Sequence, residues 1–225
     1  MNEDIKQFTS NKLWESNNPT FVNFITQYEF PWEAVINISD FIADFAQTLS
    51  DDFIEIKEQV YVHKTASIDD SVILEGPCII DTNAIVRAGA YVREYVYIGE
   101  RAIIGNSAEL KNSIIMDEAE IGHFNYVGDS ILGKRAHLGG GAIISNFRQD
   151  RSFIKIHFSS GKLETGMEKF GTLLGDYVEV GANAVINPGT LVGRNSRIYP
   201  LTQTRVSIPE NSLLKNDGKI YKLNL

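Results

Sequence analysis

The chain has 225 residues, of which 43% are hydrophobic, and a formal net charge of −8. This acidic balance argues against a general nucleic-acid-binding surface, and no apolar run approaches the roughly 18 residues that a membrane span requires. The N-terminus has no secretory signal core, and the sole cysteine, Cys78, excludes a disulfide within the chain. We therefore expect a cytoplasmic protein without nucleic-acid or membrane partners.

Residues 1–58 have the pattern of a helical segment. Pro31 suits the first turn of a helix, and the apolar residues after it recur at helical spacing, at Val35, Ile38, Ile42, Phe45 and Leu49. We predict a helical N-terminal segment over 1–58 that caps the open end of the domain that follows it. The alternative is a segment that docks a partner or covers a substrate.

From residue 59 onward the chain is repetitive. Ten successive positions six residues apart are aliphatic, namely Val62, Ile68, Leu74, Ile80, Val86, Val92, Ile98, Ile104, Leu110 and Met116. This hexapeptide repeat predicts a parallel β-helix, in which each hexad is one short strand plus a corner and three hexads form one coil. Small residues recur four places after the aliphatic positions, and Cys78 is one of them, so we expect it in the core. We place the β-helix at 59–208.

The repeat is irregular in its second half. It shortens by one residue at 116–120 and again at 127–131, and then it breaks. Residues 150–173 have no sixfold order, and the repeat resumes at Leu174. A long excursion from a strict solenoid is typical of a functional loop. We predict an inserted loop or hairpin near a site at about 150–173, and a C-terminal tail at 209–225.

A family resemblance is carried by the stretch from Gly105 to Asp150, which reads GNSAELKNSIIMDEAEIGHFNYVGDSILGKRAHLGGGAIISNFRQD. This stretch resembles the C-terminal acetyltransferase half of bacterial bifunctional N-acetylglucosamine-1-phosphate uridylyltransferase. It is also similar to the sugar-nucleotide pyrophosphorylase-like hexapeptide proteins. The resemblance implies a mainly β protein with a left-handed parallel β-helix, and an acyltransferase of UDP-N-acetylglucosamine biosynthesis.

The same resemblance implies partners and excludes one activity. It implies acetyl-CoA as co-substrate, an amino-sugar phosphate such as glucosamine 1-phosphate as acceptor, and a homotrimer with sites between neighbouring prisms. The bifunctional enzyme begins with a nucleotidyltransferase domain, whereas residues 1–58 are too short for one and carry no glycine-rich nucleotide-binding loop. We therefore expect N-acetyl transfer without uridylyl transfer.

The octapeptide from Gly122 to Asp129, GHFNYVGD, matches the motif that supplies the catalytic histidine of that family. The resemblance implies that His123 is the general base, and an imidazole suits this task because its pKa lies near neutrality. Tyr126 would hydrogen-bond the sugar or its phosphate. A run of three glycines, 139–141, also falls within the repeat, and we interpret it as a corner.

Two cations match the phosphate-binding residues of the family. Lys111 falls at the position of its phosphate-binding lysine. The matching arginine is Arg93 by an ungapped alignment and Arg87 by the local Arg-x-Gly-Ala motif, and both assignments stay open. Because successive hexads face different sides of the prism, we expect only one of the two arginines to point into the pocket.

Other positions of the motif depart from the family. Asn146 matches the asparagine that holds the sugar, but Phe147 stands where the family has a tyrosine, and His137 replaces another site asparagine. For the acyl donor, the resemblance points to Ala182, which replaces a serine, and to Pro200. Lys215 is the expected contact of a CoA phosphate.

Two rival functions follow from these departures and from the fold. A non-catalytic protein that binds or regulates through a sugar nucleotide or sugar phosphate is suggested by His137, Phe147 and Ala182. A γ-class carbonic anhydrase is built on the same solenoid and needs two histidines five residues apart. None of the four histidines here has that spacing, so we expect no metal.

Overall fold

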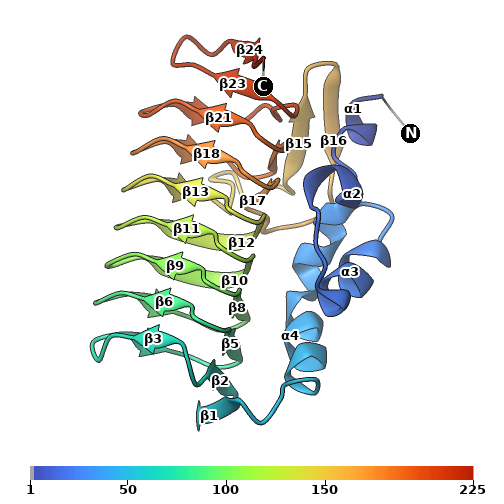
Figure 1. Ribbon diagram of the computed structural model, residues 1–225. Coiled ribbons are helices and arrows are strands. Elements are labelled where there is room, and N and C mark those ends of the chain that lie inside the picture. The colour runs from blue at the N-terminus through green and yellow to red at the C-terminus, as the bar shows by residue number, and fades with distance from the viewer. Residues whose placement is uncertain (1–2, 225) are drawn as a thin grey trace.

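The computed structural model describes residues 3–224 and is a left-handed parallel β-helix with a helical segment along one side (Figure 1). The predicted fold class is confirmed. The helical segment comprises α1 (Glu3–Lys6), α2 (Ser10–Leu13), α3 (Pro19–Thr26), the 3₁₀ helix η1 (Pro31–Asn37) and α4 (Ile38–Ala46). Pro31 opens η1, as expected for a residue whose φ is fixed near the helical value.

The coils of the solenoid form three faces. Face 1 contains β2 (Val60–His63), β5 (Cys78–Ile80), β8 (Val96–Ile98), β17 (Thr172–Leu174) and β20 (Thr190–Val192). Face 2 contains β3 (Ser67–Ile68), β6 (Ile85–Val86), β9 (Ile103–Ile104), β11 (Glu120–Ile121), β13 (His137–Leu138), β18 (Glu179–Val180), β21 (Arg197–Ile198) and β23 (Ser212–Leu214). Face 3 contains β4 (Ile73–Leu74), β7 (Tyr91–Val92), β14 (Ile143–Ile144), β19 (Val185–Ile186) and β22 (Gln203–Thr204). Two longer strands, β10 (Glu109–Ile115) and β12 (Tyr126–Leu132), bend from face 3 into face 1.

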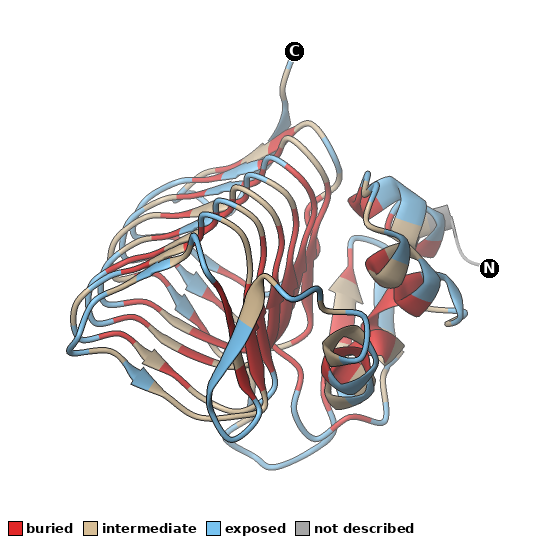
Figure 2. Ribbon diagram, turned by 60° about the horizontal axis from the view of Figure 1, so that its bottom comes forward, coloured by how far each residue is buried: buried red, intermediate tan, exposed pale blue. Residues whose placement is uncertain are grey.

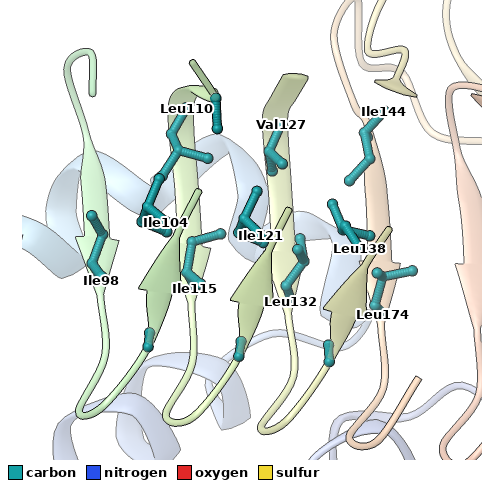
Figure 3. Packing of buried hydrophobic residues seen from close by; sticks show 14 of the residues in the cluster. Ile98, Ile104, Leu110, Ile115, Ile121, Val127, Leu132, Leu138, Ile144 and Leu174 are labelled. Atoms are coloured by element: carbon teal, nitrogen blue, oxygen red, sulfur yellow. The ribbon is translucent and has the colours of Figure 1, made fainter. Parts of the chain in front are cut away.

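The interior is a column of aliphatic side chains, one from each hexad (Figure 3). The middle of this column comprises Ile98, Ile104, Leu110, Ile115, Ile121, Val127, Leu132, Leu138, Ile144 and Leu174. The prediction that Met116 points inward is wrong. Ile115 takes the inward position, and Met116 lies among the residues that face the helical segment. The repeat thus shortens one hexad earlier than predicted, since a shift of one residue exchanges the two sides of a strand.

The helical segment packs along face 1 rather than over the open end, so the predicted cap is wrong (Figures 1 and 2). The reason is that the outward side chains of face 1 are apolar and at most 4% exposed, at Ile79, Tyr97, Ile114, Ile131, Leu173 and Leu191. Phe41 of α4, for example, meets the Tyr97 ring edge to face at 5.6 Å between centroids. Covering this second apolar surface removes it from water, which stabilises the fold.

Specific hydrogen bonds fix the same segment on the solenoid. The Trp14 indole Nε1 donates to the carbonyl oxygen of Leu174 at 2.8 Å, and the Glu15 N–H donates to the Asp176 carboxylate at 2.7 Å. The other oxygen of Asp176 accepts from the Lys134 N–H at 2.8 Å. Asp176 is 1% exposed, so one buried carboxylate joins the segment to two coils.

Antiparallel strands flank the first and last coils. β1 (Phe53–Lys57), within the stretch predicted as helical, pairs with β2, and β24 (Ile220–Lys222) pairs with β23. Leu214 of β23 is 4% exposed and belongs to the interior column, so the coils continue beyond residue 208 into the stretch predicted as a tail.

The interruption at about 150–173 contains a hairpin of β15 (Lys155–Phe158) and β16 (Gly161–Glu164). One side of the hairpin is buried against the helical segment, where Phe158 contacts Phe8 at 5.9 Å between ring centroids. Ile154 and Ile156 are fully buried in the same cluster. The excursion therefore packs on the solenoid instead of projecting freely.

Candidate active site

His123 lies on the edge of the prism between faces 2 and 3, which we name the His123 edge. The strand register stacks equivalent corner residues along this edge, namely Arg87–Ala88, Gly105–Asn106, Gly122–His123, Gly139–Gly140, Gly181–Ala182, Tyr199–Pro200 and Lys215. His123, Arg87 and the three expected acyl-donor contacts therefore share one line. At about 4.8 Å for each coil, Arg87 lies roughly 10 Å from His123 along this line.

A cavity of about 870 Å³ opens on the N-terminal side of His123. Its lining includes His123, Arg87 and Asn106 from the edge, with Asp69 and Asp70 at the far end. The aliphatic floor comes from face 2, at Ile68, Ile85, Val86, Ile103 and Ile121. Arg87 has no ion-pair partner within residues 3–224, so its guanidinium is available to an anion in this cavity.

The imidazole of His123 lies over Gly140 of the next coil. A Cβ at Gly140 would come 3.0 Å from His123 Cδ2 and 3.5 Å from Nε2. The His123 backbone carbonyl accepts from the Gly141 N–H at 2.8 Å, which ties the two coils together. In the described part of the chain, the ring of His123 makes no hydrogen bond, and it is exposed. The imidazole can occupy this position because Gly140 has no side chain.

On the C-terminal side of His123, the edge is lined by residues without bulk. Gly139, Gly140, Gly181 and Ala182 leave their backbone accessible, and among the described residues nothing accepts a hydrogen bond from the N–H groups of Gly140 and Ala182. Free N–H groups at a narrow corner can donate to carbonyl oxygens of an extended ligand.

Lys215 lies at the C-terminal end of this line. Its ammonium is 4.4 Å from the centroid of the Tyr221 ring and 5.9 Å from that of the Tyr199 ring. Such cation–π contacts hold a lysine without neutralising its charge.

The other predicted ligand residues lie on the edge between faces 3 and 1, which we name the Lys111 edge. There Arg93 and Lys111 occupy equivalent positions on adjacent coils. Each is paired within the chain: Arg93 Nη1 lies 3.1 Å from Glu109, and Lys111 Nζ lies 3.1 Å from Glu94. A phosphate at this edge must therefore compete with two carboxylates for its cations.

Tyr126 and Asn146 meet at the same edge. The Asn146 amide Nδ2 donates to the Tyr126 hydroxyl at 3.1 Å and to the Asp129 carboxylate at 2.5 Å. Burial raises the pKa of the Tyr126 phenol, so it keeps its proton at neutral pH. This pair with a hydroxyl and an amide can orient a sugar.

His137 lies apart from that pair. It is on face 2, where its Nδ1 is 2.8 Å from a Glu179 carboxylate oxygen, and it also lines the His123 cavity. Within a single prism, the predicted residues thus form two groups on two edges, with His137 joining the group around His123. Sequence reasoning missed Gly140, Asp129 and the two paired glutamates, although Asp129 closes the motif that contains His123.

Two further properties of the described residues bear on function. No helix within 3–224 combines the length and the apolar character that a membrane span requires. In the same range, no three histidine, cysteine or acidic side chains are grouped so that they could hold a metal ion.

The sixfold repeat and the stacked corners define a hexapeptide-repeat β-helix protein. Residues 74–194, more than half of the chain, match the family model of the GMPPB C-terminal domain. The chain therefore belongs to the GMPPB C-terminal domain family.

Curated relatives match the same region. The bifunctional sugar-1-phosphate nucleotidylyltransferase/acetyltransferase of Sulfurisphaera tokodaii is 36% identical over 88 residues, which cover 39% of this chain and 22% of that protein. The bifunctional protein GlmU of Methanocaldococcus jannaschii is 35% identical over 111 residues, which cover 49% of this chain and 27% of that protein. The match thus spans about a quarter of the length of these relatives.

A solved structure with a related arrangement is AntD, an N-acyltransferase from Bacillus cereus, in complex with dTDP and 3-hydroxybutyryl-CoA. It is 15% identical, with a TM-score of 0.38, and the match covers 81% of this chain and 88% of that one.

Proposed function

We propose that this protein is an acetyl-CoA-dependent N-acetyltransferase that acts on an amino-sugar phosphate such as glucosamine 1-phosphate. The observation that carries the proposal is the position of His123 at the junction of two spaces. One is the cavity with Arg87 on its N-terminal side, and the other is the line of small residues on its C-terminal side. The relatives named for sugar-1-phosphate nucleotidylyltransferase and acetyltransferase activity support the same class of reaction.

In this proposal the amino group of the acceptor lies at His123. As the amine attacks the thioester carbonyl, it must lose a proton, and the imidazole accepts that proton. The thiolate of CoA leaves and is protonated, so the products are the N-acetylated sugar and free thiol. The acceptor phosphate is bound by a cation at a distance from the base. Arg87 offers such a cation in the same cavity, and Arg93 with Lys111 offers another on the second edge.

The small residues after His123 fit an extended acyl donor. An amide-containing arm can approach the exposed backbone of Gly140 and Ala182, whose N–H groups have no acceptor among residues 3–224. Pro200 continues the line, and Lys215 at its end offers a charge for a CoA phosphate. Acetyl-CoA is therefore the co-substrate in this proposal.

We also propose a homotrimer, because the two groups of site residues lie on different edges of one prism. A neighbouring prism that places its Lys111 edge against the His123 edge would bring both groups together. Face 1 is covered by the helical segment, so faces 2 and 3 remain for such contacts. Light scattering should give a mass near three times 25.1 kDa, and a mass of one chain would contradict the shared site.

A thiol-release assay tests the function directly. Acetyl-CoA is supplied with a panel of amino-sugar 1-phosphates, 6-phosphates, nucleotide-linked amino sugars and the matching unphosphorylated amino sugars, and product acetylation is checked by mass. We expect free thiol only with amino-sugar acceptors that carry phosphate. Release with none of them would overturn the proposal.

A second candidate function is a non-catalytic protein that binds a sugar phosphate or sugar nucleotide. The observation that favours it is that no described side chain makes a hydrogen bond to the His123 ring, which contacts only the Phe124 ring among described aromatic side chains, whereas general bases are commonly held by a hydrogen bond. Binding of the acceptor panel in calorimetry without thiol release would establish this second function.

A further inference from the structure

Asp129 is a buried carboxylate beside the proposed acceptor site. It is 6% exposed and lies at a corner of the Lys111 edge, with its backbone in the left-handed region at φ 50°. Its two oxygens accept from two asparagine amides, Asn112 Nδ2 at 2.8 Å and Asn146 Nδ2 at 2.5 Å. A carboxylate that accepts two amide donors holds both of them by charge-assisted hydrogen bonds.

The consequence for Asn146 follows from donor and acceptor counting. A carboxylate only accepts, so the NH₂ group of Asn146 must face Asp129, and its carbonyl oxygen must face away. The second N–H of the same NH₂ group donates to the Tyr126 hydroxyl. That hydroxyl, occupied as an acceptor, keeps its own proton free to donate.

The geometry points to Asp129 as the positioning residue that sets the polarity of the acceptor site. Through Asp129, Asn146 presents a hydrogen-bond acceptor and Tyr126 presents a donor. The group of the ligand at Asn146 is therefore a donor, a hydroxyl or an ammonium, and the group at Tyr126 is an acceptor, such as a phosphate or ring oxygen. This inference rests on the proposed function for the identity of the ligand, but the arrangement of the side chains does not.

Several contacts keep this arrangement in place. Asn112 Nδ2 also donates to the Val35 carbonyl of η1 at 3.4 Å, and the Gly171 N–H donates to the Asp129 carbonyl at 2.8 Å. Gly128 leaves room for the pair, because a Cβ there would lie 2.5 Å from the Tyr126 hydroxyl and 2.6 Å from Asn146 Nδ2. The helical segment thus reaches the same network from outside the solenoid.

The first test is Asp129→Asn, assayed with the best acceptor of the panel. The amide keeps one accepting oxygen where Asp129 has two, so Asn112 and Asn146 must compete for it, and the charge-assisted hydrogen bond that holds Asn146 is lost. Because hydrogen bonds to charged groups contribute about 1.5–3 kcal/mol, we expect the acceptor KM to rise about 10-fold or more while the KM for acetyl-CoA stays within about twofold. An unchanged acceptor KM would overturn the inference.

The matched control is Asp176→Asn. Asp176 is also a buried corner carboxylate with two donors, but it lies on the edge between faces 1 and 2. This substitution should leave both KM values unchanged below the melting temperature, because it lies on another edge of the prism. Equal KM changes in the two variants would mean that Asp129 acts only through folding.

Asn146→Asp gives a second variant in case Asp129→Asn does not fold. It keeps an oxygen for the ligand but cannot donate to Asp129, so the acceptor KM should rise as in Asp129→Asn. A retained KM would contradict the inference, because the bond to Asp129 would then be dispensable.

A crystal structure of Asp129→Asn provides a readout independent of turnover. We expect the Asn146 amide to lose its contact with the Tyr126 hydroxyl, and an unmoved Asn146 would overturn the inference. If the wild type shows no thiol release but Asn146 turns in this variant, the proposed function fails while the positioning role of Asp129 stands.

Discussion

Gly140→Ala places a methyl group against the proposed base. The new Cβ would lie 3.0 Å from His123 Cδ2, whereas carbon atoms in contact are about 3.5–4.0 Å apart, so the ring must move by roughly 0.5–1 Å. A misplacement of about 1 Å at a reacting group can cost about 10²-fold in rate. We therefore expect kcat to fall about 10- to 100-fold.

Stability should respond differently from activity. Gly140 is not among the glycines with a left-handed backbone, so alanine brings no backbone strain there, and if the exposed imidazole moves aside it can stabilise by about 0.4–1 kcal/mol through the unfolded state. Its neighbour Gly141 has φ +72° and faces Asn183, so Gly141→Ala should lower the melting temperature instead. The assay is kcat from thiol release, with thermal melts of both variants.

A double variant shows whether Gly140→Ala acts through the imidazole of His123. If Gly140→Ala acts through the imidazole, adding it to His123→Ala should cause no further loss, because the ring is already absent. An undiminished kcat, or a loss that persists in the His123→Ala background, would refute the proposed placement of the base.

Three further predictions concern charge, pH and packing. Lys111→Ala should raise the KM for a phosphorylated acceptor about 10-fold or more, with little effect on the KM for its unphosphorylated form. Only one of Arg87→Ala and Arg93→Ala should do the same, because the two arginines lie on different edges. Equal changes in KM for the phosphorylated and unphosphorylated acceptors would contradict this. Burial raises the pKa of Asp176 to about 6, above the ordinary 3.8. The protonated carboxyl therefore contributes its full stability below pH 4, and the free energy of unfolding falls by about 3 kcal/mol as pH rises through 6. Urea unfolding at pH 4.5 and 8 should therefore show the wild type losing stability relative to Asp176→Asn, and parallel curves would count against it. Phe41→Ala should lower the free energy of unfolding, measured with urea, by about 3–5 kcal/mol, since Phe41 is 1% exposed between the helices and face 1. A decrease below about 1 kcal/mol would mean that the helical segment is loosely packed on face 1.

Much of the fold could be predicted because the six-residue repeat of aliphatic side chains is visible within short stretches of the sequence. The position of the helical segment could not, since an amphipathic helix does not specify the surface that it covers. A signal was nevertheless present: hexads of face 1 are apolar on both sides of the strand, as in Ile79 next to Ile80 and Tyr97 next to Ile98. This pattern is not specific to face 1, however, because face 2 also has apolar outward residues at Ile85 and Ile103, and face 3 has them at Ile73 and Ile143. The sequence alone therefore does not single out the covered face.

The candidate site was only partly predictable for a different reason. His123 stands in a contiguous motif, so a resemblance can find it. The pairing of Asn146 with Asp129, and the room that Gly140 leaves for the imidazole, depend on residues that meet only when the coils stack. The one-residue shortening of coils decides which residues meet, and Met116 shows that this shift cannot be placed from aliphatic spacing alone.

The proposed role of His123 as the base of an acetyl transfer is tested most directly by comparing thiol release by the wild type and by His123→Ala. Both proteins are assayed with acetyl-CoA and the best amino-sugar phosphate, with melting temperatures measured in parallel. We expect kcat to fall by about 10²-fold or more, since removal of a general base costs about 10²- to 10⁴-fold. The melting temperature should stay nearly unchanged, because the exposed imidazole makes no hydrogen bond within residues 3–224. Equal kcat in the two proteins would contradict the proposed role of His123.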